Sequence, residues 1–86
     1  GGHFAESDFT NADLNESSCI QADFRFTNLL DTSFRSTKCG GALFMEASVI
    51  ATDFRDSILD RADFSDATIQ GANFSGVNTG EVFGIE

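Results

Sequence analysis

The sequence predicts a solenoid of short stacked repeats, and three observations share one period of five residues. In the segment IQADFRFTNLLDTSF, residues 20–34, the apolar residues Phe24, Leu29 and Phe34 lie five apart, and a small residue precedes each by two positions. Charged residues are confined to the other three positions of each pentad, apart from the final Glu86. A helix repeats every 3.6 residues and a strand every two, so neither explains this period. The two uncharged positions are therefore expected to point inward.

The apolar residue of each pentad, here called the central position, forms the expected core. Eight of the ten phenylalanines lie at central positions, and position −2, two residues earlier, is Gly, Ser, Ala or Thr up to Ala72. The predicted core consists of Phe4, Phe9, Leu14, Cys19, Phe24, Leu29, Phe34, Cys39, Phe44, Val49, Phe54, Leu59, Phe64, Ile69 and Phe74.

The composition is consistent with one small domain. The chain has 86 residues, a net charge of −9 and no proline or tryptophan. A globular domain of this size would bury only ~60–65% of its unfolded surface, whereas stacked repeats need only their neighbours for packing. No apolar run approaches the ~20 residues of a membrane span, so we expect a soluble chain without a membrane partner. The compartment is left open, with the cytoplasm favoured.

Several pentads share a small residue followed by Asp or Asn and then by Leu or Phe. The direct matches are Ala12-Asp13-Leu14, Ala22-Asp23-Phe24, Ala62-Asp63-Phe64 and Ala72-Asn73-Phe74. This pattern resembles the pentapeptide-repeat family over about residues 2–78. The resemblance implies an all-β fold, a right-handed quadrilateral β-helix in which four pentads make one coil of twenty residues, with about four coils. We therefore expect a pentapeptide-repeat β-helix at residues 1–78, followed by a C-terminal tail or cap at 79–86.

A coil of twenty residues assigns each core residue to one of four walls. Two opposite walls would stack large rings, and the two walls between them would stack smaller groups. The ring walls are Phe4, Phe24, Phe44 and Phe64, and opposite them Leu14, Phe34, Phe54 and Phe74. The other walls are Phe9, Leu29, Val49 and Ile69, and opposite them Cys19, Cys39, Leu59 and Thr79. Such complementarity suits a narrow interior, because protein cores are close-packed.

The pattern fades after residue 78, where Thr79 occupies a central position. An open end of a β-helix exposes unpaired strand edges, so a covering element is expected. Phe83 and Ile85 could fold over the last coil as a cap, pair with a second chain, or belong with sequence beyond this segment.

The two cysteines, Cys19 and Cys39, are twenty residues apart and are therefore expected on the same wall of successive coils. Buried free thiols that act as small apolar fillers are the favoured interpretation, and a disulfide is the alternative. A metal site is not expected, because His3 is the only imidazole and belongs to a different wall.

No catalytic constellation is indicated. A single histidine near a terminus cannot support a nucleophilic triad at defined spacing, and carboxylates on outer faces lack the cleft that a general acid needs. We expect no enzyme activity, no cofactor and no direct binding of nucleic acid.

The outward positions define a candidate partner surface. The first face, the outer side of residues 3–6, 23–26, 43–46 and 63–66, carries five carboxylates against Arg25, a net charge of −4. The third face has a net charge of −2, the second −2, and the fourth is balanced. Leu30 and Ile50 should touch on the second face, and Phe26 and Met45 lie near the corner that it shares with the first face. The candidate partner-binding residues are Phe26, Leu30, Met45, Ile50, Asp23, Glu46 and Asp63.

Three functional hypotheses follow. The first is a non-enzymatic rigid scaffold whose acidic and apolar face binds another protein of unknown identity. The second, which the family resemblance implies, is a DNA mimic that binds a type II topoisomerase such as gyrase, although the gyrase-binding members are longer and dimerise through a C-terminal helix. The third is a structural spacer within a longer protein. A homo-oligomer through the coil ends or the Leu30 and Ile50 face is a further option.

Overall fold

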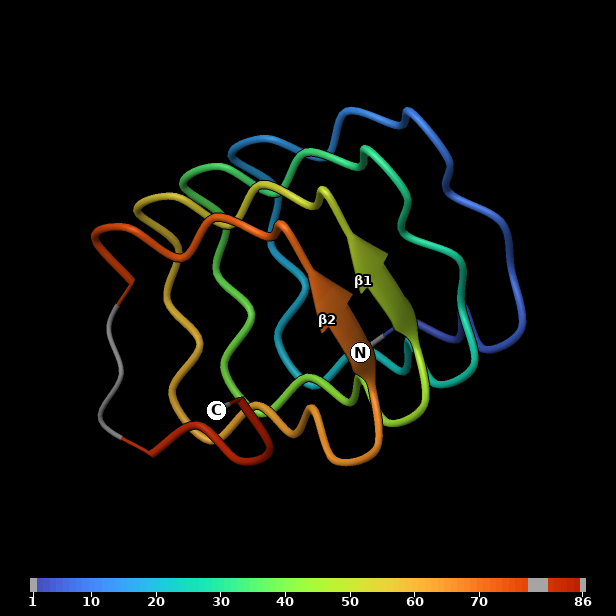
Figure 1. Cartoon of the computed structure of the whole chain (residues 1–86). Helices are drawn as coiled ribbons and strands as arrows, with labels where there is room; N and C mark the ends of the chain where they lie inside the picture. The colour runs from blue at the N-terminus through green and yellow to red at the C-terminus, as the bar shows by residue number, and fades with distance from the viewer. Residues whose placement is uncertain (1, 78–80, 86) are drawn as a thin grey trace.

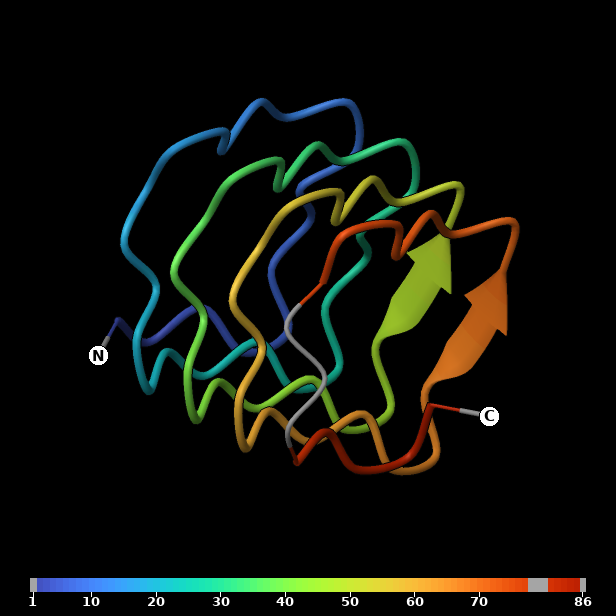
Figure 2. The ribbon, with the colours of Figure 1, turned by 90° about the vertical axis from the view of Figure 1, so that its left-hand side faces the viewer.

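The chain winds into a stack of four-sided coils. The computed structural model describes residues 2–77 and 81–85, and in them strands, bridges and turns make up the β-helix without any α-helix (Figures 1 and 2). The two regular strands, β1 (Ser48–Ile50) and β2 (Thr68–Gln70), pair in parallel with Val49 opposite Ile69. The described part spans 27 × 24 × 18 Å, so it forms a short block.

Parallel pairing between residues twenty apart holds the coils together. The bridged residues fall into four columns, one for each face of the coil. The columns are His3, Asp23, Leu43, Asp63 and Phe83; Asp8, Asn28, Ser48 and Thr68; Asp13, Ser33, Asp53 and Asn73; and Ser18, Lys38 and Ile58. Each column member sits at position −1, directly before the central residue, so the pairing aligns equivalent residues of successive pentads. This register places equivalent residues of successive coils next to one another throughout the interior.

A tight turn makes each corner of the coil. The N–H of position −2 donates to the carbonyl of the preceding central residue, as Ser7 does to Phe4 at 3.1 Å and Thr32 to Leu29 at 3.1 Å. At position +2, two residues after the central one, twelve residues other than glycine have φ between 54° and 65°. A positive φ at the third residue is the mark of a type II turn and favours glycine. Coil pairing therefore overrides local preference at nearly every corner.

Two ladders of phenylalanine rings fill the core. Rings twenty residues apart stack with centroids 4.6–5.3 Å apart, as Phe44 does on Phe24 and Phe64. The two ladders meet edge to face across the interior, at 5.5 Å and 88° between Phe44 and Phe54. Both arrangements are favoured geometries for aromatic pairs. The opposite ring walls expected from the sequence are thus present.

Burial of the predicted core depends on how many neighbouring coils each residue has. The fully buried members are Cys19, Phe24, Leu29, Phe34, Cys39, Phe44, Val49, Phe54, Leu59 and Phe64. Phe9, Leu14, Ile69 and Phe74 are partly buried and pack against them. Phe4 departs from the prediction, because 37% of it is exposed. Its ring stacks on Phe24 at 5.1 Å but has a coil on one side alone.

Position −2 admits buried hydroxyl groups because the backbone satisfies them. Thr27 and Thr37 donate to the carbonyl three residues earlier, at 2.6 and 2.8 Å. Thr32 and Thr52 instead donate to carbonyls of the neighbouring coil, both at 2.7 Å. Within the described part of the chain, no buried side-chain nitrogen or oxygen lacks a hydrogen-bond partner. Small polar residues therefore fit inside without a desolvation penalty.

The C-terminal segment 81–85 continues the ladder of the first face. Phe83 bridges to Asp63, and Gly84 takes the central position. Val82 and Ile85 pack partly buried against the core, whereas 52% of Phe83 is exposed. Ile85 thus contacts the core, whereas Phe83, at position −1, points outward. Thr79 lies outside the described residues.

Candidate interaction surface

The predicted apolar residues border the second face: Phe26 and Met45 lie in turns that precede it, and Leu30 and Ile50 lie in turns that follow it. We call this set the corner surface; it comprises Phe26, Leu30, Met45 and Ile50 with the carboxylates Asp23, Glu46 and Asp63. Leu30 lies opposite Ile50 on the next coil, because Leu29 N–H donates to Ser48 and Asp31 N–H to Ile50. The exposed fraction of Leu30 is 36%, and Ile50 is half-buried in β1. The backbone register therefore places Leu30 and Ile50 at equivalent positions of adjacent coils.

Phe26 is the most unusual member of the corner surface. Its φ is 61°, its N–H donates to Met45 at 3.1 Å, and 53% of it is exposed. The left-handed conformation costs about 1–2 kcal/mol for a residue with a Cβ, and a bulky side chain is rare there. The equivalent corner positions on other coils hold Glu6, Glu46 and Asp66. Phe26 thus places an apolar ring in water at a position where neighbouring coils carry carboxylates.

The three predicted carboxylates differ in whether a neighbouring group pairs with them. Asp23 forms an ion pair with Arg25 at 2.7 Å and accepts the Arg25 backbone N–H at 3.0 Å. Asp63 accepts both the N–H and the hydroxyl of Ser65, at 2.9 and 2.5 Å. Glu46 is exposed and, among the described residues, has no ion pair. Asp23 is therefore largely neutralised by its own coil, which the sequence did not indicate.

Stability in acid should depend on the pair of Asp23 and Arg25. Hydrogen bonds from the Arg25 side chain and backbone lower the pKa of Asp23 to about 2, below the ~3.9 of an unfolded chain. The stabilisation is complete above pH ~4 and is lost as the pH falls through about 2, because the unfolded chain binds the proton first. Asp23→Asn should flatten this part of a plot of unfolding free energy against pH, measured by urea titration. Arg25→Gln should flatten the same part of the plot less, because the backbone N–H of residue 25 still donates to Asp23, and an unchanged plot in this variant would contradict the assignment.

Aspartate or asparagine at position −1 has a structural reason. At seven of these positions the side-chain Oδ1 accepts the backbone N–H two residues later, at 2.9–3.1 Å, in an Asx-type turn. The seven are Asp8, Asp13, Asp23, Asn28, Asp53, Asp63 and Asn73. Five of the fourteen acidic residues are thus accounted for by local backbone geometry. The alternation of Asp with Asn at this position was the sequence signal for it.

The two cysteines are free thiols on one wall of successive coils. Cys39 Sγ lies 3.2 Å from the hydroxyl of Thr37 and is fully buried. Hydrogen bonding to Cys19, together with burial, raises the pKa of the Cys39 thiol. Cys39 is accordingly a protonated filler of the core rather than a reactive thiolate.

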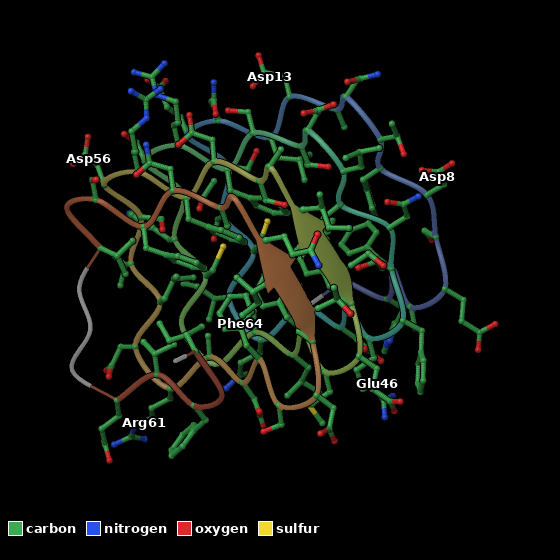
Figure 3. All side chains as sticks on the ribbon, in the orientation of Figure 1. Asp8, Asp13, Glu46, Asp56, Arg61 and Phe64 are labelled. Atoms are coloured by element: carbon green, nitrogen blue, oxygen red, sulfur yellow. The ribbon has the colours of Figure 1, made fainter. Side chains whose placement is uncertain are left out.

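Charged groups surround the block without converging on a reaction centre. Figure 3 shows Asp8, Asp13, Glu46, Asp56 and Arg61 on the outside of the coils and Phe64 inside. Across residues 2–77 and 81–85, no cluster of three or more His, Cys, Asp or Glu side chains is placed to hold a metal ion. The same residues contain no helix long and apolar enough to cross a bilayer. A hollow of about 360 Å³ lies on the fourth face, away from the corner surface.

Comparison with known proteins agrees with this architecture. Two family models described as pentapeptide repeats match the chain, at residues 3–38 and 34–78. A solved structure of a pentapeptide repeat protein from the thylakoid lumen of Arabidopsis thaliana is 28% identical, with a TM-score of 0.64. The match covers 95% of this chain and 61% of that protein, so this chain spans about three-fifths of its length. None of the curated proteins matches the chain. The second family model alone covers more than half of the sequence, and the chain belongs to the pentapeptide-repeat family.

Proposed function

We propose that the chain is a non-enzymatic scaffold that binds another protein through the corner surface. In this proposal the backbone is a right-handed β-helix of about four coils, and its stiffness holds the apolar side chains in place. Two unbonded cysteines support a reducing compartment such as the cytoplasm, whereas the Arabidopsis relative is a protein of the thylakoid lumen.

The observation that carries the proposal is the placement of Phe26. Eleven other corner residues share its positive φ, so Phe26 is distinguished by a bulky, 53% exposed ring where the equivalent corners of the other coils carry carboxylates. Met45 lies at the same corner of the next coil, and Leu30 and Ile50 add apolar area at the other edge of the second face. A partially apolar surface beside the free carboxylate of Glu46 has the composition of a contact centre with a polar rim.

Rigidity adds to the affinity that such a surface can reach. Backbone hydrogen bonds between coils fix residues at both corners of the second face, including Phe26 to Met45 at 3.1 Å and Asp31 to Ile50 at 3.0 Å. A preorganised surface loses little conformational entropy on binding. A contact of this kind is therefore favoured even though the area is small.

The alternative of a DNA mimic has weaker support. Nine net charges over the longest dimension of 27 Å correspond to one per about 3 Å, compared with one per ~1.7 Å of duplex DNA. The two pairs Asp23–Arg25 and Asp53–Arg55, with N–O distances of 2.7 and 2.8 Å, interrupt the negative surface further. A spacer role makes no use of the corner surface at all.

The scaffold proposal is tested by Leu30→Asp combined with Ile50→Asp. Proteins captured from the source lysate by the parent chain are identified by mass spectrometry, and the affinity of the best candidate is then measured with purified components. Losing two apolar contacts should weaken binding by about 10–100-fold, or ~1.4–2.8 kcal/mol, since both side chains are already partly buried and each contributes less than the ~1.5–3 kcal/mol of full burial. Binding should persist in moderate salt.

The matched control is Ser36→Asp combined with Ser75→Asp, which adds the same charge on the exposed third face. Equal loss in this control would point to charge alone. A partner whose binding survives the Leu30 and Ile50 changes would contradict the proposal. A captured topoisomerase released by salt would favour the mimic, and no specific capture at all would favour the spacer.

A further inference from the structure

The fourth face carries a hollow that the scaffold proposal does not use. It measures about 360 Å³ and is lined by Ile20, Lys38, Gly40, Gly41, Ile58 and Arg61, among others. The coil register places Gly40 between Ile20 and Asp60, and Gly41 between Gln21 and Arg61. At these two positions, the outer coils therefore carry side chains and the middle coil carries none.

Gly40 is not required by the fold. Its φ is outside the left-handed region, and a Cβ built there would come no closer than 3.6 Å to the Asp60 carbonyl, an ordinary contact. Position +1 is the one directly after the central residue. In all the remaining pentads up to Ser75, this position holds a residue other than glycine. Gly41, at φ 68°, relieves backbone strain in its turn. Gly40 relieves none, and the absence of its side chain leaves the hollow open.

The walls of the hollow combine apolar groups with the cations Lys38 and Arg61 and one carboxylate, Asp60. Ile20 and Ile58 are exposed apolar residues, at 48% and 43%. Arg61 reaches Glu81 only at 3.8 Å, and both side chains are mostly exposed. Lys38 is exposed and has no ion pair within the described residues. By contrast, Arg25 is held tightly by a carboxylate of its own face, at 2.7 Å.

Charge makes this the face that an anionic group would approach. The other three faces have net charges of −4, −2 and −2, whereas Lys38 and Arg61 balance Asp60 and Glu81 here. On a chain of net charge −9, a negatively charged partner is repelled elsewhere. Exposed ammonium and guanidinium groups pair well with carboxylates.

The size of the face selects a peptide over a second copy of the chain. Three rungs about 4.8 Å apart, each of four residues of about 3.4 Å, give roughly 200 Å². A stable protein interface needs about 800 Å² per partner, and a second copy would also bring nine negative charges. A volume of 360 Å³ is at the lower end for ligand sites and accommodates an apolar side chain.

We propose that the fourth face binds an acidic peptide segment of a partner protein. One apolar side chain of the peptide rests over Gly40 between Ile20 and Ile58, and flanking carboxylates pair with Lys38 and Arg61. The peptide is held by side chains, because the backbone of the middle coil is already paired: Gln21 N–H donates to Gly40 and Gly41 N–H donates to Asp60, both at 2.9 Å.

The test is an NMR titration of the isotope-labelled chain with a short peptide in which two aspartates flank a leucine on each side. Amide shifts should be confined to Ile20, Gly40, Gly41 and Ile58 and their neighbours. A peptide with serine in place of leucine should bind at least ~10-fold more weakly, a difference of about 1.4 kcal/mol. Binding should weaken as salt rises, because the paired charges are exposed.

Two variants locate the contacts. Gly40→Leu fills the hollow and should weaken binding at least ~10-fold, with circular dichroism to confirm that the fold is kept. Lys38→Glu should weaken binding more than Arg35→Glu, which makes the same charge change on the third face. Leu30→Asp combined with Ile50→Asp should leave peptide affinity within about twofold, so this test and that of the corner surface fail independently.

Three outcomes would overturn the proposal. The first is no shift at peptide concentrations up to about 2 mM, where even weak contacts are visible. The second is equal binding of the serine peptide, which would mean that charge attraction alone explains the binding. The third is a set of shifts on another face, or full binding by Gly40→Leu.

Discussion

Phe44→Ala is expected to lower the free energy of unfolding by about 3–5 kcal/mol. Phe44 is fully buried and lies between Phe24 and Phe64, with ring centroids at 5.1 and 4.6 Å. Its ring also meets Phe34 and Phe54 edge to face. The paired coils cannot collapse into the space, because their spacing is set by backbone hydrogen bonds. Urea unfolding followed by circular dichroism measures the loss, a large share of the ~4–13 kcal/mol expected for a chain of this length.

The matched control is Phe4→Ala, at the same wall of the first coil. Phe4 stacks on Phe24 at 5.1 Å but is 37% exposed, so its removal opens a site that water already reaches. We expect a loss of about 1 kcal/mol, less than half of the value of full burial. An equal loss in the two variants would contradict the exposed position of Phe4 and would indicate that the first coil is covered in solution, for example by self-association.

The interior of this fold could be predicted from sequence because its geometry allows few choices. Every central residue faces a narrow space bounded by four walls, so a charge or a gap there is not tolerated. That constraint explains why Phe34 and Leu59 were placed correctly by spacing alone, and both are fully buried. This constraint is weaker at the ends of the stack. Phe4 has only one neighbouring coil, and Phe83 is exposed because it occupies an outward position.

The outward residues carry far less information. Register identified Leu30 and Ile50 as neighbours, but it could not show that Asp23 is neutralised by Arg25, because that pair depends on side-chain rotamers within one coil. The hollow at Gly40 was missed for a related reason. In sequence alone, two adjacent glycines at a corner indicate only a relaxed turn, and the φ of each residue is needed to separate Gly41, where it is positive, from Gly40, where it is not.

Gly84→Ala is expected to lower the free energy of unfolding by about 2–4 kcal/mol. A Cβ at Gly84 would lie 2.5 Å from the Phe64 carbonyl carbon and 2.5 Å from the Ser65 nitrogen, both of them backbone atoms that cannot move aside. The segment 81–85 would have to lift away, with loss of the hydrogen bonds from Phe64 to Phe83 and from Phe83 to Ala62, at 2.7 and 3.0 Å. Each contributes about 1 kcal/mol, and the φ of 84° adds about 1–2 kcal/mol for alanine.

Gly71→Ala separates the clash from the backbone strain. Gly71 has a φ of 64°, but a Cβ there would meet nothing within 4 Å, and Ala51 already adopts a φ of 54° at the equivalent corner one coil away. This control should therefore cost only about 1 kcal/mol in the same urea titration. Equal losses in the two variants would mean that the C-terminal segment is not docked on Phe64 in solution. A larger loss at Gly84, together with faster amide exchange at Phe64, would establish that this segment closes the end of the helix and stabilises its last coil.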